Sequence, residues 1–335
     1  MTAAHVPKAT LCELTFHLPR AGTSTDRSSR FLVPDYFPGS VWASVPRLTA
    51  LEKGFTENEL EQRIVDLSKG ENFSPAFLRL APAGQIPALV VPYEHTLDEG
   101  IATKFRAIQG TTAICDFLDT STTRSATHSA PALSPATVQR AADSKELIAH
   151  VHKEEGPDPN KLLLSFRNEK ERDAKWNGLV GGFLRGRQEA LERYSKEVGD
   201  GDAKLRDFYQ KKLEENGGLI AMYEGRRDSS DWQKASLAMW AAVPKTLALL
   251  ESKYEGEAPY LLGDQISLAD LHVGAWFARV LACAGATSLT DIAGDLAALE
   301  SNFPEGDKVG PKVAKWAETL FERESFKNVY GEGLH

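Results

Sequence analysis

The chain has 335 residues and a formal net charge of −8, with 26% charged and 42% hydrophobic residues. This length predicts two domains with enough apolar material for packed cores. The acidic balance argues against a nucleic-acid or anionic-membrane partner, and no segment is apolar enough to span a bilayer. Cys12, Cys115 and Cys283 lie too far apart for a disulfide framework. We therefore expect a soluble protein of a reducing compartment, the cytoplasm.

Residues 9–119 alternate short apolar runs with turn signals, which indicates a domain of mixed strands and helices. One helix is expected where apolar residues recur at spacings of three and four, with Gly54 as its stop signal. The expected order is strand, helix, strand, strand, at residues 9–16, 41–55, 63–67 and 88–91, with a further short helix after Gly110.

The remainder of the chain differs in composition and in the spacing of its apolar residues. Residues 120–136 are rich in Ser, Thr, Ala and Pro, which predicts a linker between the domains, with a plain solvated loop as the alternative. Residues 137–335 are predicted to form an all-helical domain. Pro244 interrupts one apolar helical pattern, so we expect a kinked helix or two helices there. The charged run 167–175 is interpreted as a solvated helix face.

The most specific helix start is at Ser267 and Asp270, which have the spacing of a capping box. Ile266 and Leu271 occupy the positions of a hydrophobic staple around this cap. This pattern is structural, and we assign it no chemistry.

Two short segments have the residue types of a peptide-binding site. In one, Pro87 precedes an apolar strand, and a cis Ile86–Pro87 bond would turn the Ile86 N–H and C=O outward to pair with an extended peptide. In the other, Gly110 and Thr111 open a helix whose free N–H groups favour a carboxylate. The alternatives are a proline-rich turn and a threonine cap without a ligand. Cys115 is interpreted as a packing residue.

Five segments, in the same order along the chain, resemble the signatures of cytosolic glutathione transferases of the serine class, in a fungal-like form with extended insertions. They are VPRLTALEKGF (45–55), APAGQIPAL (81–89), GTTAICDFL (110–118), GDQISLAD (263–270) and KWAETLFERESFKNVY (315–330). The resemblance implies an α+β fold, with a thioredoxin-like βαβαββα domain over residues 9–119 followed by the all-helical domain, and commonly a homodimer.

The resemblance also implies a catalytic hydroxyl. Ser40 aligns with the Ser that opens the family's S-P-x-x-x-K-V motif, with Val41 in place of Pro. The thiol of glutathione has a pKa of roughly 8.5 and is mostly protonated at pH 7. A hydroxyl that donates to the sulfur at a helix N-terminus favours the thiolate. Ser40 is therefore the expected catalytic residue.

Contacts to glutathione follow from the same resemblance. Ile86 pairs by its backbone with the cysteinyl part, and Thr111 takes the position of the Ser that holds the γ-glutamyl carboxylate. Gly110 stands where the family has Glu, and Gln109 is expected to supply part of that contact. The expected binding residues are Gln85, Ile86, Pro87, Gln109, Gly110 and Thr111.

Two insertions depart from the family pattern. Residues 19–39 lengthen the turn before the first helix and contain Tyr36, the rival to Ser40 as thiol-activating residue. Residues 150–233 add helical segments and a glycine cluster, which we interpret as a site of close helix packing: Gly178, Gly181, Gly182 and Gly186.

The sequence thus predicts a glutathione transferase that conjugates hydrophobic electrophiles in detoxification, with no metal ion. A glutathione-dependent thiol reductase is one alternative, but that chemistry requires a cysteine at the helix start, and none occurs between Cys12 and Cys115. A non-catalytic binding or regulatory protein of the same fold is the other.

Overall fold

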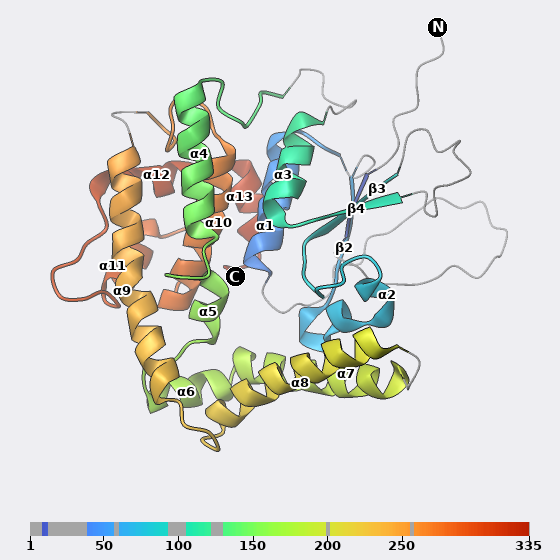
Figure 1. The fold of residues 1–335 in the computed structure, drawn as a ribbon. Helices are drawn as coiled ribbons and strands as arrows, with labels where there is room; N and C mark the ends of the chain where they lie inside the picture. Colours follow the sequence, from blue (N-terminus) through green and yellow to red (C-terminus); the bar gives the residue numbers. More distant parts are fainter. Residues whose placement is uncertain are drawn as a thin grey trace, which may run out of the picture.

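The structure is a computed structural model with a small sheet domain beside a larger helical domain (Figure 1). It describes residues 9–12, 39–56, 60–92, 105–121, 130–198, 202–254 and 258–334. Most of the 19–39 insertion, Tyr36 included, lies outside the described residues, as does the expected first strand beyond Cys12.

The N-terminal domain contains a four-stranded sheet in the order β2-β1-β3-β4. The strand β1 pairs parallel with β2 and antiparallel with β3, which pairs antiparallel with β4. The elements, in chain order, are β1 (Ala9–Cys12), α1 (Val41–Glu52), β2 (Leu60–Arg63), α2 (Pro75–Leu78), β3 (Ala88–Pro92), β4 (Phe105–Gln109) and α3 (Thr111–Thr120). This order confirms the predicted thioredoxin-like βαβαββα arrangement.

One strand was predicted at the wrong residues. The expected strand at 63–67 lies instead at Leu60–Arg63. Its apolar residues continue beyond the strand, but the Asp66 side chain accepts hydrogen bonds from the backbone N–H groups of Ser68 and Lys69. These bonds start a short 3₁₀ turn at Leu67–Lys69, and a chain that turns cannot extend the sheet.

The helical domain is arranged around one central helix, α10, in which every residue from Leu268 to Leu281 is buried. Its helices are α4 (Val138–Val151), α5 (Pro159–Leu164), α6 (Glu169–Trp176), α7 (Leu179–Val198), α8 (Ala203–Tyr223), α9 (Ser230–Lys253), α10 (Leu268–Ala284), α11 (Ile292–Glu300), α12 (Pro311–Phe321) and α13 (Glu324–Tyr330). Pro244 lies inside the single helix α9, so of the two predicted alternatives, a kinked helix or two helices, the second is wrong.

The capping box at the start of α10 is confirmed, because the Ser267 and Asp270 side chains each bond to the other residue's backbone. The buried Asp270 carboxylate also accepts hydrogen bonds from the Leu261 N–H and from Trp316 Nε1, both at 2.9 Å. Burial raises the pKa of Asp270, which these donors partly oppose. The cap therefore joins α10 to the preceding loop and to α12.

The described part of the predicted linker is largely exposed, but it is anchored at Leu133 and Ser134. Asp119, at the end of α3, accepts hydrogen bonds from the N–H groups of Leu133 and Ser134 at 2.7 and 2.9 Å. Lys53 forms a buried ion pair with the same carboxylate at 3.2 Å. Leu133 is buried in the helical core. This anchoring fixes where the chain enters the helical domain.

Helices α7 and α8 form a hairpin that reaches under the N-terminal domain (Figure 1). A Cβ atom at Gly186 would lie 2.2 Å from the Ser68 carbonyl oxygen, so only glycine permits this approach. The Tyr209 hydroxyl donates to the Phe73 carbonyl at 2.7 Å. The interpretation of the glycine cluster as close packing is confirmed at Gly186, whereas Gly182 faces open space.

The charged run before α7 is only partly the solvated face that was predicted. Glu169 and Lys170 are exposed, but Lys175 turns inward and donates to the carbonyl oxygens of Leu163 and Ser165. Burial lowers the pKa of Lys175. Its ammonium group satisfies carbonyls at the end of α5, which is a structural role.

Candidate functional site

One end of the sheet gathers most of the predicted site residues. Ala88, at the start of β3, is paired with Cys12 at the end of β1 and with Gln109 at the end of β4. Because these pairings are antiparallel, Pro87 lies beside the start of α3. The structure therefore brings together the two segments that the sequence analysis treated separately.

The Ile86–Pro87 peptide bond is cis, as predicted. Ile86 is half-buried and Gln85 is exposed. The main-chain N–H and C=O of Ile86 form no hydrogen bond within the described part of the chain. They are therefore available to pair with an extended peptide.

The start of α3 also has free donors. Gly110 has a φ of 86°, which favours glycine, and the first helical bond runs from the Ile114 N–H to the Gly110 carbonyl. The N–H groups of Thr111 and Thr112 have no partner among the described residues. Sequence analysis missed Thr112, whose exposed side chain lies at the same helix end.

The side chains of Thr111 and Gln109 already have partners in the structure. The Thr111 hydroxyl donates to the Trp42 carbonyl at 3.3 Å, and Thr111 is buried. Gln109 Nε2 donates to the Leu80 carbonyl at 2.9 Å, which leaves its Oε1 atom as an acceptor. At Thr111 the backbone N–H, rather than the hydroxyl, is thus the available donor.

Ser40 is the N-cap residue of α1, which lies between the sheet and the helical domain (Figure 1). Its carbonyl accepts hydrogen bonds from the N–H groups of Ala43 and Ser44. Its half-buried hydroxyl makes no capping bond, and the N–H groups of Val41 and Trp42 have no partner in the described structure. Hydroxyl and helix dipole can therefore act together on a ligand at this point.

The helical domain places a histidine pair against α1. The ring of His152 stacks on Trp42 with centroids 3.8 Å apart, and its Nε2 lies 2.8 Å from Nδ1 of His272. Burial lowers the pKa of His152 to about 4 and that of His272 well below its usual value. Both rings are therefore neutral at pH 7. No local sequence pattern indicates this contact, because its partners are 120 positions apart.

A second residue that sequence analysis missed is Arg279. It belongs to the buried face of α10 and is 2% exposed. Its Nη2 donates to the Gly39 carbonyl at 2.6 Å, immediately before Ser40.

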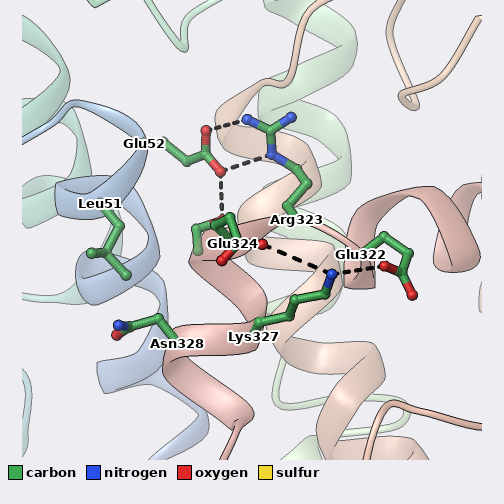
Figure 2. Close-up of a pocket in the computed structure, with 8 residues that line it drawn as sticks. Leu51, Glu52, Glu322, Arg323, Glu324, Lys327 and Asn328 are labelled. Atoms are coloured by element: carbon green, nitrogen blue, oxygen red, sulfur yellow. Dashed lines mark hydrogen bonds and ion pairs between the residues drawn. The ribbon is translucent and has the colours of Figure 1, made fainter.

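A pocket lies at the C-terminal end of α1, away from Ser40 (Figure 2). It is lined by Leu51, Glu52, Glu322, Arg323, Glu324, Ser325, Lys327 and Asn328. Its charged groups bond to one another: Glu52 accepts from Arg323 Nε and Nη2 at 2.8 and 2.6 Å, and Lys327 pairs with Glu322 at 2.7 Å. We interpret these ion pairs as contacts that hold the two domains together, and we assign the pocket no ligand.

Two family models match the sequence. The model described as the glutathione S-transferase N-terminal domain matches residues 39–121, and the one described as its C-terminal domain matches residues 218–319. The chain carries both domains of the glutathione S-transferase family. The first match spans Ser40, the cis-proline loop and the start of α3, whereas the α7–α8 hairpin lies mainly between the two matches.

Several solved structures are similar at low identity. The β-etherase LigF from Sphingobium sp. strain SYK-6 is 18% identical, with a TM-score of 0.46, over 85% of this chain and 92% of that one. Human glutathione S-transferase T1-1 is 18% identical, with a TM-score of 0.43, over 87% and 84%. Poplar (Populus trichocarpa) glutathione transferase F2 is 18% identical, with a TM-score of 0.41, over 87% and 93%. No curated protein matches the sequence.

In the described part of the chain, no three His, Cys, Asp or Glu side chains are grouped so that they could bind a metal ion. None of the described helices has the length and apolar character required to cross a membrane.

Proposed function

We propose that this protein is a glutathione transferase of the serine type, in which Ser40 activates the glutathione thiol for attack on a hydrophobic electrophile. The observation that carries the proposal is a set of polar groups that have no partner among the described residues: the Ser40 hydroxyl, the main-chain groups of Ile86 and the first N–H groups of α3. Buried or half-buried polar groups normally have partners, so a cluster without them favours a ligand.

The proposed glutathione contacts follow from these groups. The cysteinyl part pairs with the N–H and C=O of Ile86 beside cis-Pro87. The γ-glutamyl carboxylate accepts from the N–H groups of Thr111 and Thr112 at the positive end of the α3 dipole. Gln109 Oε1 accepts from the γ-glutamyl amine, in place of the family's Glu carboxylate.

The proposed chemistry is thiol activation. The thiol loses its proton to water, and the Ser40 hydroxyl donates a hydrogen bond to the resulting thiolate. Lowering the thiol pKa by about two units requires ~2.7 kcal/mol of differential stabilisation, which one hydroxyl bond and a helix end can supply. The thiolate then attacks an electrophilic carbon, a carbon–sulfur bond forms, and the leaving group takes the bonding electrons. This role fits detoxification.

The reductase alternative finds little support in the described thiols. Cys115 is buried, as predicted, and burial raises its pKa to about 12. Burial also raises the pKa of Cys283. Neither is the low-pKa cysteine at a helix start that thiol exchange requires.

Binding and activity separate the three functions. Glutathione at 100 times its dissociation constant should stabilise the protein by about 2.7 kcal/mol, which a thermal shift detects. A transferase should conjugate glutathione to a chloronitroaromatic acceptor, and a reductase should instead reduce a disulfide. A folded protein that shows no shift at millimolar glutathione would support the non-catalytic alternative.

Ser40→Ala tests the catalytic hydroxyl. We expect glutathione binding to be nearly retained and the thiol pKa to rise by about one to two units, because a hydrogen bond to a charged group contributes roughly 1.5–3 kcal/mol. The pH–rate profile should move upward by the same amount. Tyr36→Phe is the matched variant: if it loses activity while Ser40→Ala keeps both activity and profile, the inserted loop supplies the hydroxyl.

We further propose a homodimer, as the family resemblance implies, that resides in the cytoplasm and uses no metal cofactor. Light scattering coupled to size-exclusion chromatography measures the mass, and a monomer at micromolar concentration would contradict the dimer.

A further inference from the structure

The guanidinium of Arg279 is a buried cation for which the described residues supply no counter-ion. Among the described residues its only hydrogen bond runs from Nη2 to the Gly39 carbonyl, and its Nε has no partner there. A buried charge is costly unless an opposite charge or further hydrogen bonds compensate it. Its surroundings therefore favour an anion.

The titratable groups around Arg279 and the start of α1 do not supply a negative charge. Burial raises the pKa of Cys283, and of Tyr330 to about 12, so both are neutral at pH 7. The other charged groups that act on Cys283 and Tyr330 are the cations Lys175 and Arg47. The His152–His272 pair beside Trp42 is neutral.

The hydrogen bond from Arg279 to the Gly39 carbonyl also fixes the orientation of the Gly39–Ser40 peptide. The Gly39–Ser40 peptide is trans, because the one cis bond of the described chain is Ile86–Pro87. The C=O and N–H of a trans peptide point in opposite directions. Arg279 holds the Gly39 carbonyl toward α10, and the Ser40 N–H therefore points away from α10. That N–H has no partner among the described residues.

We propose that Arg279 is a positioning residue for the reaction: it locks the Gly39–Ser40 peptide and adds a fixed positive charge to the start of α1, so that this helix end holds the sulfur as a thiolate. The proposal rests on the proposed function. It extends that function by assigning the helical domain a part in thiol activation. Ser40 supplies the hydroxyl. Arg279 orients the Gly39–Ser40 peptide and places a positive charge beside it.

The test measures the thiol pKa of bound glutathione from the ultraviolet absorbance of the thiolate as a function of pH. In R279Q, which keeps an N–H donor but loses the charge, we expect the pKa to rise by about one unit. R279K should give a smaller rise, because an ammonium keeps the charge but lacks the planar fork of the guanidinium. R323M is the matched control: it removes an interdomain arginine at the opposite end of α1 and should lower the melting temperature without moving the thiol pKa.

The outcomes separate this inference from the proposed function. Wild-type protein that does not bind glutathione overturns the proposed function and, with it, this role of Arg279. Wild-type protein that binds glutathione and lowers its thiol pKa, while folded R279Q gives the same pKa, overturns the role of Arg279 alone. If R279Q does not fold, the thiol pKa is measured in R279K instead. An unshifted thiol pKa in that variant also overturns the role of Arg279. A rise in R323M equal to that in R279Q would show that any loosened domain contact has this effect.

Discussion

The two ends of helix α1 differ in how their polar groups are satisfied. At its C-terminal end, Glu52 bonds to Arg323 and Ser325, and Lys53 pairs with Asp119. At its N-terminal end, the Ser40 hydroxyl caps nothing and Arg279 has no carboxylate among the described residues. The comparison teaches that one end of the same helix is held by ion pairs and hydrogen bonds, whereas the other has polar groups without a partner in the described structure, as the proposed ligand site requires.

The largest expected effect is an acid sensitivity at the N-terminal end. The pKa values of His152 and His272 are lowered in the folded protein, so the unfolded chain binds more protons as the pH falls below about 6.5. Stability should therefore fall as the pH falls from about 6.5 to about 4, by about 3 kcal/mol for His152 alone. Urea unfolding at a series of pH values measures this loss.

The control for the acid effect is the double variant His152→Gln, His272→Gln. Its stability should depend less on pH over the same range, although it starts lower at pH 7. An unchanged pH dependence would mean that other groups carry the acid sensitivity.

The next effect concerns the C-terminal end. Glu52→Ala should lower the free energy of unfolding by about 2 kcal/mol, because it leaves Arg323 half-buried without its partner. The thiol pKa and the turnover of the folded enzyme should not change. Lys327→Ala is the matched control, since its exposed pair with Glu322 lines the same pocket and is screened by solvent, so its loss should change stability far less than Glu52→Ala. Lost turnover in folded Glu52→Ala would contradict the division between the two ends.

The smallest effect is expected at Thr111. Thr111→Val removes the hydroxyl bond to the Trp42 carbonyl and should cost about 1 kcal/mol of stability. Glutathione affinity, measured by calorimetry, should fall less than tenfold, because the backbone N–H donors remain. Thr112→Val tests the exposed neighbour in the same assay. A loss of more than a hundredfold in Thr111→Val would show that the hydroxyl itself binds the ligand.

Local sequence signals predicted much of this fold. The Pro87 cis bond and the capping box of Ser267 and Asp270 are confirmed, because each depends on residues that are close together in the chain. The strand at Leu60–Arg63 was misplaced because the Asp66 cap, rather than the apolar pattern, decides where the chain turns. At this position the Asp66 cap, and not the spacing of the apolar residues, sets where the strand can extend.

The missed parts of the candidate site depend on contacts between distant segments. Arg279 stands in the apolar pattern of α10, where nothing indicates that it reaches Gly39, 240 positions away. The contact between His152 and His272 crosses the chain in the same way. The roles of Ser40 and of the glutathione-binding residues remain predictions, and Tyr36 remains the rival.

The α7–α8 hairpin has a consequence for how independent the two domains are. Its residues come after the N-terminal domain in the chain, yet Tyr209 bonds to Phe73, and the guanidinium of Arg187 lies 4.8 Å from the centre of the Phe73 ring. Phe73 is 2% exposed in the whole chain. A fragment that ended at residue 121 would expose this ring and aggregate more readily. The burial of Phe73 in the N-terminal domain is therefore completed by a segment that is translated long after it.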